Sequence, residues 1–366
     1  MTDPASDCRF DDLPSKRNRW RLLGLKFTLL ILTLSFSFLL AEIAYRILLN
    51  ARYRYEVAHY ANGTWVPVPT GEVYRLKPGA VGEVALPENP KIFWRYKINA
   101  QGFRGGTLGP KNASIKRMIF LGDSYAFGWG LSEDQLPFPA ITEHLMNKDE
   151  PTTTTEVLNA AIPGYNTQQE LALLEEIGPQ YKPDTVVLTY VMNDSEPVAQ
   201  TLNVPIPPRL IFQHCRSWIL ADVVEIMNAK ILHRPLFRTC KNKYDFNYAN
   251  GFRADSSKWR DTQHALQAMA DFCDRRGMHL LLVILPDTSR TLDHSYPYAS
   301  IHQTVADWAR HASFDVLDLL PAFMNSGQKY RMQGDGHPNA EAHRKMAELI
   351  SSRLKVAETQ HSRSGK

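Results

Sequence analysis

The longest hydrophobic run of the chain lies near its N-terminus, over residues 22–44. At a helical rise of about 1.5 Å per residue, the run is long enough to cross a hydrocarbon layer about 30 Å thick. Only Lys26 and Glu42 interrupt it, near its two ends, where a long side chain reaches the polar headgroups. Because every face of this helix is apolar, a transmembrane anchor fits better than a buried helix of a soluble domain.

A cleaved signal peptide is the alternative interpretation, and it requires small residues just before the cleavage site. Cleavage after Ala41 or Ala44 would place Leu39 or Glu42 at the third position before the cut, so an uncleaved anchor fits better. Basic residues are more frequent before or within the run than after it: Lys16, Arg17, Arg19, Arg21 and Lys26 against Arg46, Arg52 and Arg54. This bias predicts a single pass, with residues 1–21 in the cytoplasm and the remainder periplasmic or otherwise extracytoplasmic.

Two patterns of shorter hydrophobic runs follow the anchor. Residues 45–110 contain alternating runs such as VYRL and FWRYKI between turn residues, which predicts a small β-rich lead-in. Over residues 111–357, near-continuous apolar runs alternate with amphipathic helical segments, which is typical of an α/β domain whose parallel sheet is covered on both faces. The predicted strands are Met118–Leu121, Val157–Ala160, Thr185–Val191, His279–Leu285 and Phe314–Leu319.

Helical periodicity predicts helices between and after these strands. Residues 261–276 place apolar side chains on one face, with Gly277 as the stop. The last predicted helix covers residues 340–354, and residues 358–366 are predicted to be a disordered tail. Residues 196–257 break the rhythm with a long, proline-containing insertion. Such a loop is usually functional, so a lid or substrate-binding insertion is one interpretation, and a decoration without a binding role is the other.

Charge and cysteine content narrow the class of protein. The net charge of +4 is spread between acidic residues and forms no stripe that follows a phosphate backbone, so nucleic-acid binding is not expected. Cys273 is predicted to be a buried free thiol. Cys215 and Cys240 form a disulfide if their Cβ atoms come close, and the alternative of a zinc site with neighbouring histidines matches no standard ligand spacing. No cofactor or metal is implied.

Candidate chemistry begins in the segment RMIFLGDSYAFGWG. It places Ser124 at the carboxyl end of the first predicted strand of the sheet, the edge where ligands bind in open parallel sheets. An exposed serine beside free backbone amides suits a nucleophile. The three letters GDS alone are also typical of a plain turn, and Asp123 is interpreted as a turn former.

Three further motifs follow in the order of a known family. AAIPGYN around Gly164, VMND around Asn193 and DGHPNAEAH around His337, together with the Ser124 block, resemble the SGNH/GDSL hydrolase family over about residues 99–354. INAQGFRG, before the first strand, resembles the lead-in of membrane-anchored bacterial members, which are related to envelope-glycan acetylesterases and O-acetyltransferases. The resemblance implies the flavodoxin-like, three-layer SGNH hydrolase fold over residues 111–357.

The resemblance also implies roles for individual residues. Ser124 is the expected nucleophile, His337 its base and Asp335 the acid that orients the imidazole. The expected oxyanion hole consists of the backbone amides of Ser124 and Gly164 and the side chain of Asn193. Each also has a structural interpretation, because histidine and asparagine cap helices and glycine forms turns.

Two positions depart from the family pattern. The third motif usually carries a glycine two residues before its asparagine, and here Val191 takes that position, which is expected to leave less room beside the oxyanion. The acid usually stands three residues before the histidine, where this chain has Gly334, so Asp335 is one residue closer.

Three hypotheses about function follow. The first is a serine esterase that acts on an acyl ester, such as an acetyl ester of an envelope glycan, through an acyl-serine intermediate. The second is an O-acetyltransferase with the same residues and a polysaccharide hydroxyl as acceptor. The third is a non-catalytic glycan-binding or assembly protein that keeps the fold. The expected partners are the membrane and an acyl ester or glycan.

Overall fold

A five-stranded parallel sheet forms the centre of the chain, in the order β6-β5-β7-β8-β9. In this computed structural model, the described residues are 16–59, 64–68, 74–86, 89–148, 153–196, 219, 248 and 250–364. The strands are β5 (Ile115–Leu121), β6 (Thr154–Asn159), β7 (Thr185–Tyr190), β8 (His279–Ile284) and β9 (Asp315–Asp318). All five predicted strands are therefore confirmed, with small shifts at their ends.

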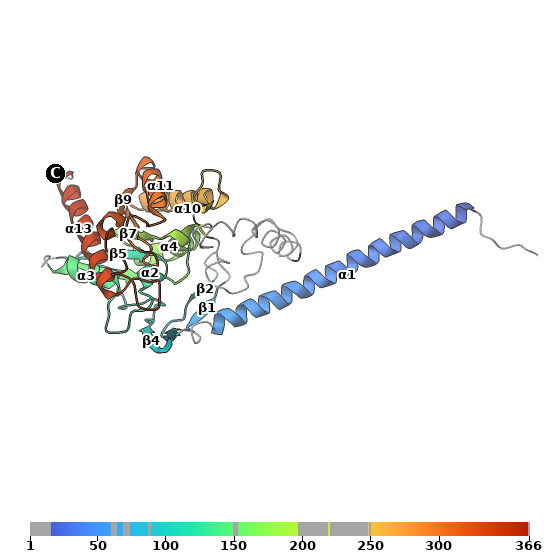
Figure 1. Cartoon of the computed structure of the whole chain (residues 1–366), viewed down its shortest axis with the longest axis horizontal. Coiled ribbons are helices and arrows are strands. Elements are labelled where there is room, and N and C mark those ends of the chain that lie inside the picture. Colours follow the sequence, from blue (N-terminus) through green and yellow to red (C-terminus); the bar gives the residue numbers. More distant parts are fainter. Residues whose placement is uncertain are drawn as a thin grey trace, which may run out of the picture.

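Helices cover both faces of the sheet and bury its apolar strands. On one face α3 (Phe138–Asn147) packs against α13 (Ala340–Ser364), and on the other α4 (Thr167–Tyr181) packs against α10 (Ser257–Asp274). Helix α11 (Ala299–His311) joins the second layer, where Trp308 meets Trp259 of α10. The short helix α12 (Leu320–Phe323) follows β9. The predicted α/β architecture with three layers is confirmed (Figure 1).

The connections place a topological switch point at β5. The chain runs from β5 to β6 on one side, then returns to β7 on the other side and continues outward through β8 and β9. Loops from β5 and its two neighbours therefore diverge at the carboxyl edge, which is where open α/β sheets bind ligands.

The N-terminal helix α1 (Lys16–His59) extends far beyond the α/β domain (Figure 1). Its segment Trp20–Leu48 is long and apolar enough to cross a membrane, and almost all of its side chains there are exposed. The helix continues through residues 45–59, where the β-rich lead-in was expected to begin. That expectation was wrong at this boundary, because no proline or glycine stands between Gly24 and Gly63 to end the helix.

The lead-in itself is β-rich, as predicted. It forms two antiparallel pairs, β1 (Trp65–Pro67) with β2 (Tyr74–Leu76), and β3 (Val81–Leu86) with β4 (Asn89–Lys97). Buried aromatic side chains fix both pairs to the α/β domain. The Tyr74 hydroxyl donates to the Pro163 carbonyl at 2.8 Å, and the Tyr96 ring meets the edge of Phe127 at 5.1 Å. Both contacts reach loops at the carboxyl edge of the sheet.

The C-terminal helix α13 is longer than predicted and covers most of the segment expected to be a disordered tail. Ala357 is buried and Lys116 forms an ion pair with Glu358, so tertiary contacts extend past Leu354. Most of the predicted insertion at 196–257, including Cys215 and Cys240, lies outside the described residues. Cys273 is buried and free, and burial raises its pKa to about 12.

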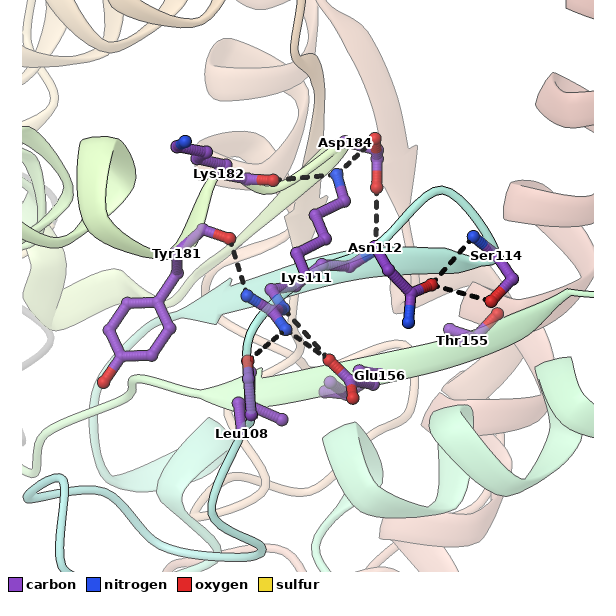
Figure 2. Close-up of polar contacts among 12 residues, drawn as sticks. Leu108, Lys111, Asn112, Ser114, Thr155, Glu156, Tyr181, Lys182 and Asp184 are labelled. Atoms are coloured by element: carbon purple, nitrogen blue, oxygen red, sulfur yellow. Dashed lines mark hydrogen bonds and ion pairs between the residues drawn. The ribbon is translucent and has the colours of Figure 1, made fainter.

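A polar network joins the amino ends of β5, β6 and β7 (Figure 2). Buried Arg117 donates to the carbonyls of Gly109 and Tyr181 and to the Glu156 carboxylate. Asp184 accepts from the Arg117 amide and from Lys111. These bonds tie β5 to β6 and to the start of β7.

Candidate active site

The nucleophile turn follows directly after β5. Gly122 has φ +154°, and a Cβ atom there would lie 2.1 Å from Thr189 Oγ1, so only glycine fits between β5 and β7. Asp123 caps the short helix α2 (Ser124–Phe127) by accepting from the Tyr125 amide at 2.8 Å. Asp123 is thus a turn former, as interpreted from the sequence, and Ser124 becomes the first residue of α2.

Ser124, His337 and Asp335 form a continuous chain of hydrogen bonds. Nε2 of His337 lies 2.9 Å from Oγ of Ser124, although 213 residues separate them. Nδ1 of the same ring lies 2.5 Å from Asp335 Oδ1. In the tautomer that suits both contacts, Nδ1 donates to the carboxylate and Nε2 accepts from the serine hydroxyl.

The departure at Gly334 is compatible with this geometry. Gly334 has φ +77°, a conformation that glycine adopts more readily than an acid would. Asp335, two residues before the histidine, reaches both the backbone amide of His337 at 3.0 Å and its ring. Burial tends to raise the pKa of Asp335, but the hydrogen bonds and charge of His337 outweigh it and hold the pKa below its ordinary value.

The loop that carries His337 is fixed by residues that the sequence did not single out. Arg331 Nε donates to the Asp335 carbonyl at 3.0 Å, and Thr288 Oγ1 donates to the Gly336 carbonyl at 2.7 Å. A Cβ atom at Gly336 would lie 2.7 Å from that of Ser289. The Thr288 and Ser289 contacts depend on the loop after β8 meeting the loop before α13, so no motif marks them, whereas Arg331 lies four residues before Asp335 in the same loop.

The three expected oxyanion donors lie on adjacent loops. Ser124 follows β5, Gly164 (φ +80°) follows β6 and Asn193 lies in the 3-10 turn Met192–Ser195 after β7. Within the described part of the chain, neither the Ser124 nor the Gly164 backbone amide donates a hydrogen bond. The Asn193 Nδ2 donates to Asp123 Oδ2 at 2.9 Å, which leaves its second N–H.

Val191 is buried and its backbone is extended, with φ −123°. This conformation is open to any residue, so the turn does not require the usual glycine. The Val191 amide donates to Asp194 Oδ2 at 2.8 Å, and this bond closes the turn that carries Asn193.

The candidate residues are partly exposed, whereas their chain neighbours are mostly buried. The imidazole lies near two aromatic rings, with centroid distances of 5.4 Å to Tyr125 and 6.4 Å to Trp129. Among the described residues, no group of three or more His, Cys, Asp or Glu side chains is placed to hold a metal ion.

The fold and this geometry define a class of α/β proteins with a serine, a histidine and an acid at the carboxyl edge of a parallel sheet. The chain belongs to the GDSL-like Lipase/Acylhydrolase family, whose model matches residues 120–345. A comparison with curated proteins found no match.

Several solved structures are similar to the chain. TesA is 18% identical, with a TM-score of 0.41, over 66% of this chain and 98% of its own. A two-domain esterase active on acetylated mannans is 15% identical, with a TM-score of 0.41, over 67% of this chain and 50% of its own. Axe2, an acetylxylan esterase from Geobacillus stearothermophilus, is 12% identical, with a TM-score of 0.39, over 65% of this chain and 94% of its own.

Proposed function

We propose that the chain is a membrane-anchored serine esterase and that Ser124, His337 and Asp335 are its catalytic residues. The observation that carries this proposal is the hydrogen-bonded chain from Ser124 Oγ through the imidazole to the Asp335 carboxylate. A serine hydroxyl is a weak nucleophile at neutral pH and needs an adjacent base in this position.

The reaction follows from the positions of the donors and acceptors. His337 Nε2 takes the proton as Ser124 Oγ attacks the ester carbonyl, and Asp335 stabilises the imidazolium. The oxyanion faces the free amides of Ser124 and Gly164 and the remaining N–H of Asn193. The imidazolium then protonates the leaving alcohol, which gives an acyl-serine. Water, deprotonated by His337, attacks this ester and releases the carboxylic acid and Ser124.

We also propose that α1 anchors the enzyme with its N-terminus in the cytoplasm and the catalytic domain outside. The apolar segment Trp20–Leu48 and the excess of basic residues before it support this orientation. Substrates would then be esters of the cell envelope.

A serine-directed fluorophosphonate tests the catalytic assignment on the full chain in detergent micelles. The expected result is one adduct on Ser124 of the parent chain and none in S124A. The variant S114A, which removes a serine from the opposite edge of the sheet, is the control and is expected to keep the adduct. An unlabelled parent chain would contradict the proposal.

Acyl transfer to a sugar hydroxyl uses the same residues and differs only in the acceptor. Incubation of the enzyme with an acetyl donor in the presence of polysaccharide separates the two reactions by their products. Free acetate alone identifies hydrolysis, and an acetylated polysaccharide identifies transfer. Glycan binding without either product, unchanged in S124A, identifies a binding protein.

A further inference from the structure

Trp129 lies beside the imidazole at the carboxyl edge of the sheet. The centroid of its ring is 6.4 Å from that of His337, with 47° between the planes, and its backbone amide donates to the Ser124 carbonyl at 2.9 Å. The indole is partly exposed, although Phe127 and Gly128 just before it are buried. A substrate whose ester carbonyl lies at Ser124 therefore has this ring as a near neighbour.

The ring packs against two aromatic side chains of the lead-in segment. Buried Trp94 of β4 meets it edge-on at 5.5 Å, and buried Tyr96 lies at 6.1 Å. Buried Arg104 donates to the carbonyls of Phe127, Gly128 and Leu131, and so clamps the loop that carries Trp129. A ring fixed in this way loses little conformational freedom when a ligand stacks on it.

Among the described residues, the partly exposed side chains close to the serine and the imidazole include polar groups and Met332, whose backbone amide donates to the His337 carbonyl. Asn193 reaches Asp123, and Asp335 contacts the imidazole directly. Asp287 accepts from the Tyr125 hydroxyl at 3.3 Å, and the Tyr125 ring lies 5.4 Å from the imidazole. One aromatic face among hydrogen-bonding groups suits a ligand with an apolar face and a hydroxylated edge. A long acyl chain would instead need a continuous apolar wall.

We propose that Trp129 is the platform on which a pyranose ring of an O-acylated sugar stacks. One face of a pyranose presents C–H groups with partial positive charge, which are attracted to the negative face of an indole. This inference rests on the proposed function and narrows its substrate class to acyl esters of sugars. Trp129 then binds the sugar that forms the alcohol part of the ester, and Ser124 and His337 cleave the ester bond.

The test measures the hydrolysis of two kinds of acetyl ester by the full chain in detergent micelles. The first kind is a panel of O-acetylated methyl pyranosides (gluco, galacto and manno). The second is ethyl acetate, which has no ring. Removal of the indole in W129A is expected to lower the ratio of their kcat/KM values about tenfold, the upper range for a stacked ring. The loss is expected mainly in KM for the pyranosides, with a smaller loss in W129F.

The matched control is W308F, because Trp308 packs against Trp259 and Phe314 between α10, α11 and β9. It is expected to keep the parental ratio. An equal loss for both esters in W129A would assign the indole a purely structural role and overturn the platform. A parent chain that prefers ethyl esters of long-chain fatty acids to every pyranoside would also overturn it, in favour of a lipid substrate.

A binding measurement separates this inference from the proposed hydrolysis. Saturation-transfer NMR detects methyl pyranosides bound to the full chain whether or not any ester is cleaved. If the parent releases no acetate and Ser124 is not labelled, hydrolysis fails as the function. A saturation-transfer signal from the pyranosides that is present with the parent and absent with W129A would still support the stacking platform. No such signal with the parent would overturn it.

Discussion

The hydroxyl proton of Ser124 has two acceptors within reach. Nε2 of His337 lies 2.9 Å from Oγ, and Asp123 Oδ2 lies 3.2 Å from it. Burial raises the pKa of Asp123, and hydrogen bonds from Asn193 and the Tyr125 amide oppose this effect. The nearer acceptor is the imidazole, whose second nitrogen is already paired with Asp335. Two carboxylates thus lie near Ser124, and we expect them to act differently. Asp335 is expected to act through His337, and Asp123 through Asn193, and single substitutions can distinguish these roles.

Asp335→Asn tests the first of these roles. The amide no longer favours the ring tautomer with a proton on Nδ1 and cannot stabilise the imidazolium, so kcat is expected to fall about 1,000- to 10,000-fold. The control is D318N, because Asp318 Oδ1 lies 2.8 Å from Nδ1 of buried His302 without a serine at Nε2. Acetate release by both variants is the measurement. A loss in D335N no larger than in D318N would contradict the assignment.

Asp123 is expected to act by orienting Asn193. Asn193→Ala removes the proposed oxyanion donor, and kcat is expected to fall about 100- to 1,000-fold. Asp123→Asn disturbs the 2.9 Å bond that orients the Asn193 side chain and is expected to lower kcat about 10-fold or more. If Asp123 acts only by orienting Asn193, the double variant loses little more than N193A alone. Multiplied losses in the double variant would show that Asp123 acts independently. Steady-state kinetics of the four proteins measures this.

The sequence was sufficient to propose the catalytic residues. It was insufficient to find the residues that fix the positions of their loops. Ser124 and His337 stand in motifs whose order is visible along the chain. The bond of Asp123 to Asn193, the bond of Thr288 to Gly336 and the three carbonyls at Arg104 each join segments that no local pattern connects. Only the tertiary structure shows them.

At the scale of elements, the contact between α3 and α13 contains a buried histidine. Nδ1 of His343 accepts from the Phe138 amide at 3.1 Å, and the two rings are stacked with centroids 5.5 Å apart. The ring must be neutral to accept at Nδ1. Burial, together with the charges of Arg104 and His337, lowers the pKa of His343 to about 3.

This histidine is expected to make the fold sensitive to acid. A lowered pKa in the folded state means that the unfolded chain binds the proton first, near pH 6.5, so stability is complete above that pH and is lost as the pH falls towards 3. His343 is expected to contribute a loss of about 2 kcal/mol between pH 7 and pH 5. Urea unfolding of parent and H343N at both pH values measures the difference, with H311N as the control for removing an exposed histidine. Equal pH dependence in parent and H343N would contradict this.

Element boundaries were harder to predict than element types. The strands β5, β7 and β8 are nearly continuous apolar runs, and their burial in the sheet follows from that pattern. Helix α1 exceeds its predicted ends because the apolar run marks only the segment suited to a membrane, and α13 exceeds its predicted end because its packing continues past Leu354 to Ala357 and Glu358. Good helix formers continue a helix beyond its packed part until a breaker appears.

For the whole molecule, the two edges of the sheet separate stability from chemistry. Among the described residues, the carboxyl edge holds Ser124, His337 and backbone amides without hydrogen-bond partners, whereas the amino edge holds the Arg117 network (Figure 2). In that network the Arg117 side chain is 3% exposed and its partner Glu156 21%, whereas Asp184, the partner of Lys111, is 50% exposed. Arg117 and Lys111 thus belong to one cluster, but the ion pair of Arg117 is more deeply buried than that of Lys111.

Substitution of each cation by methionine is expected to separate their contributions. R117M leaves the buried carbonyl of Tyr181 and the carbonyl of Gly109 without this donor and Glu156 without its partner, so the free energy of unfolding is expected to fall by about 3–5 kcal/mol. K111M breaks a more exposed ion pair and is expected to cost about 0–1 kcal/mol. Urea unfolding of the full chain in micelles gives both values. Because this edge lies across the sheet from Ser124, the folded fraction of each variant is expected to keep the parental kcat. Equal losses of stability in the two variants would show that burial does not determine the strength of this network.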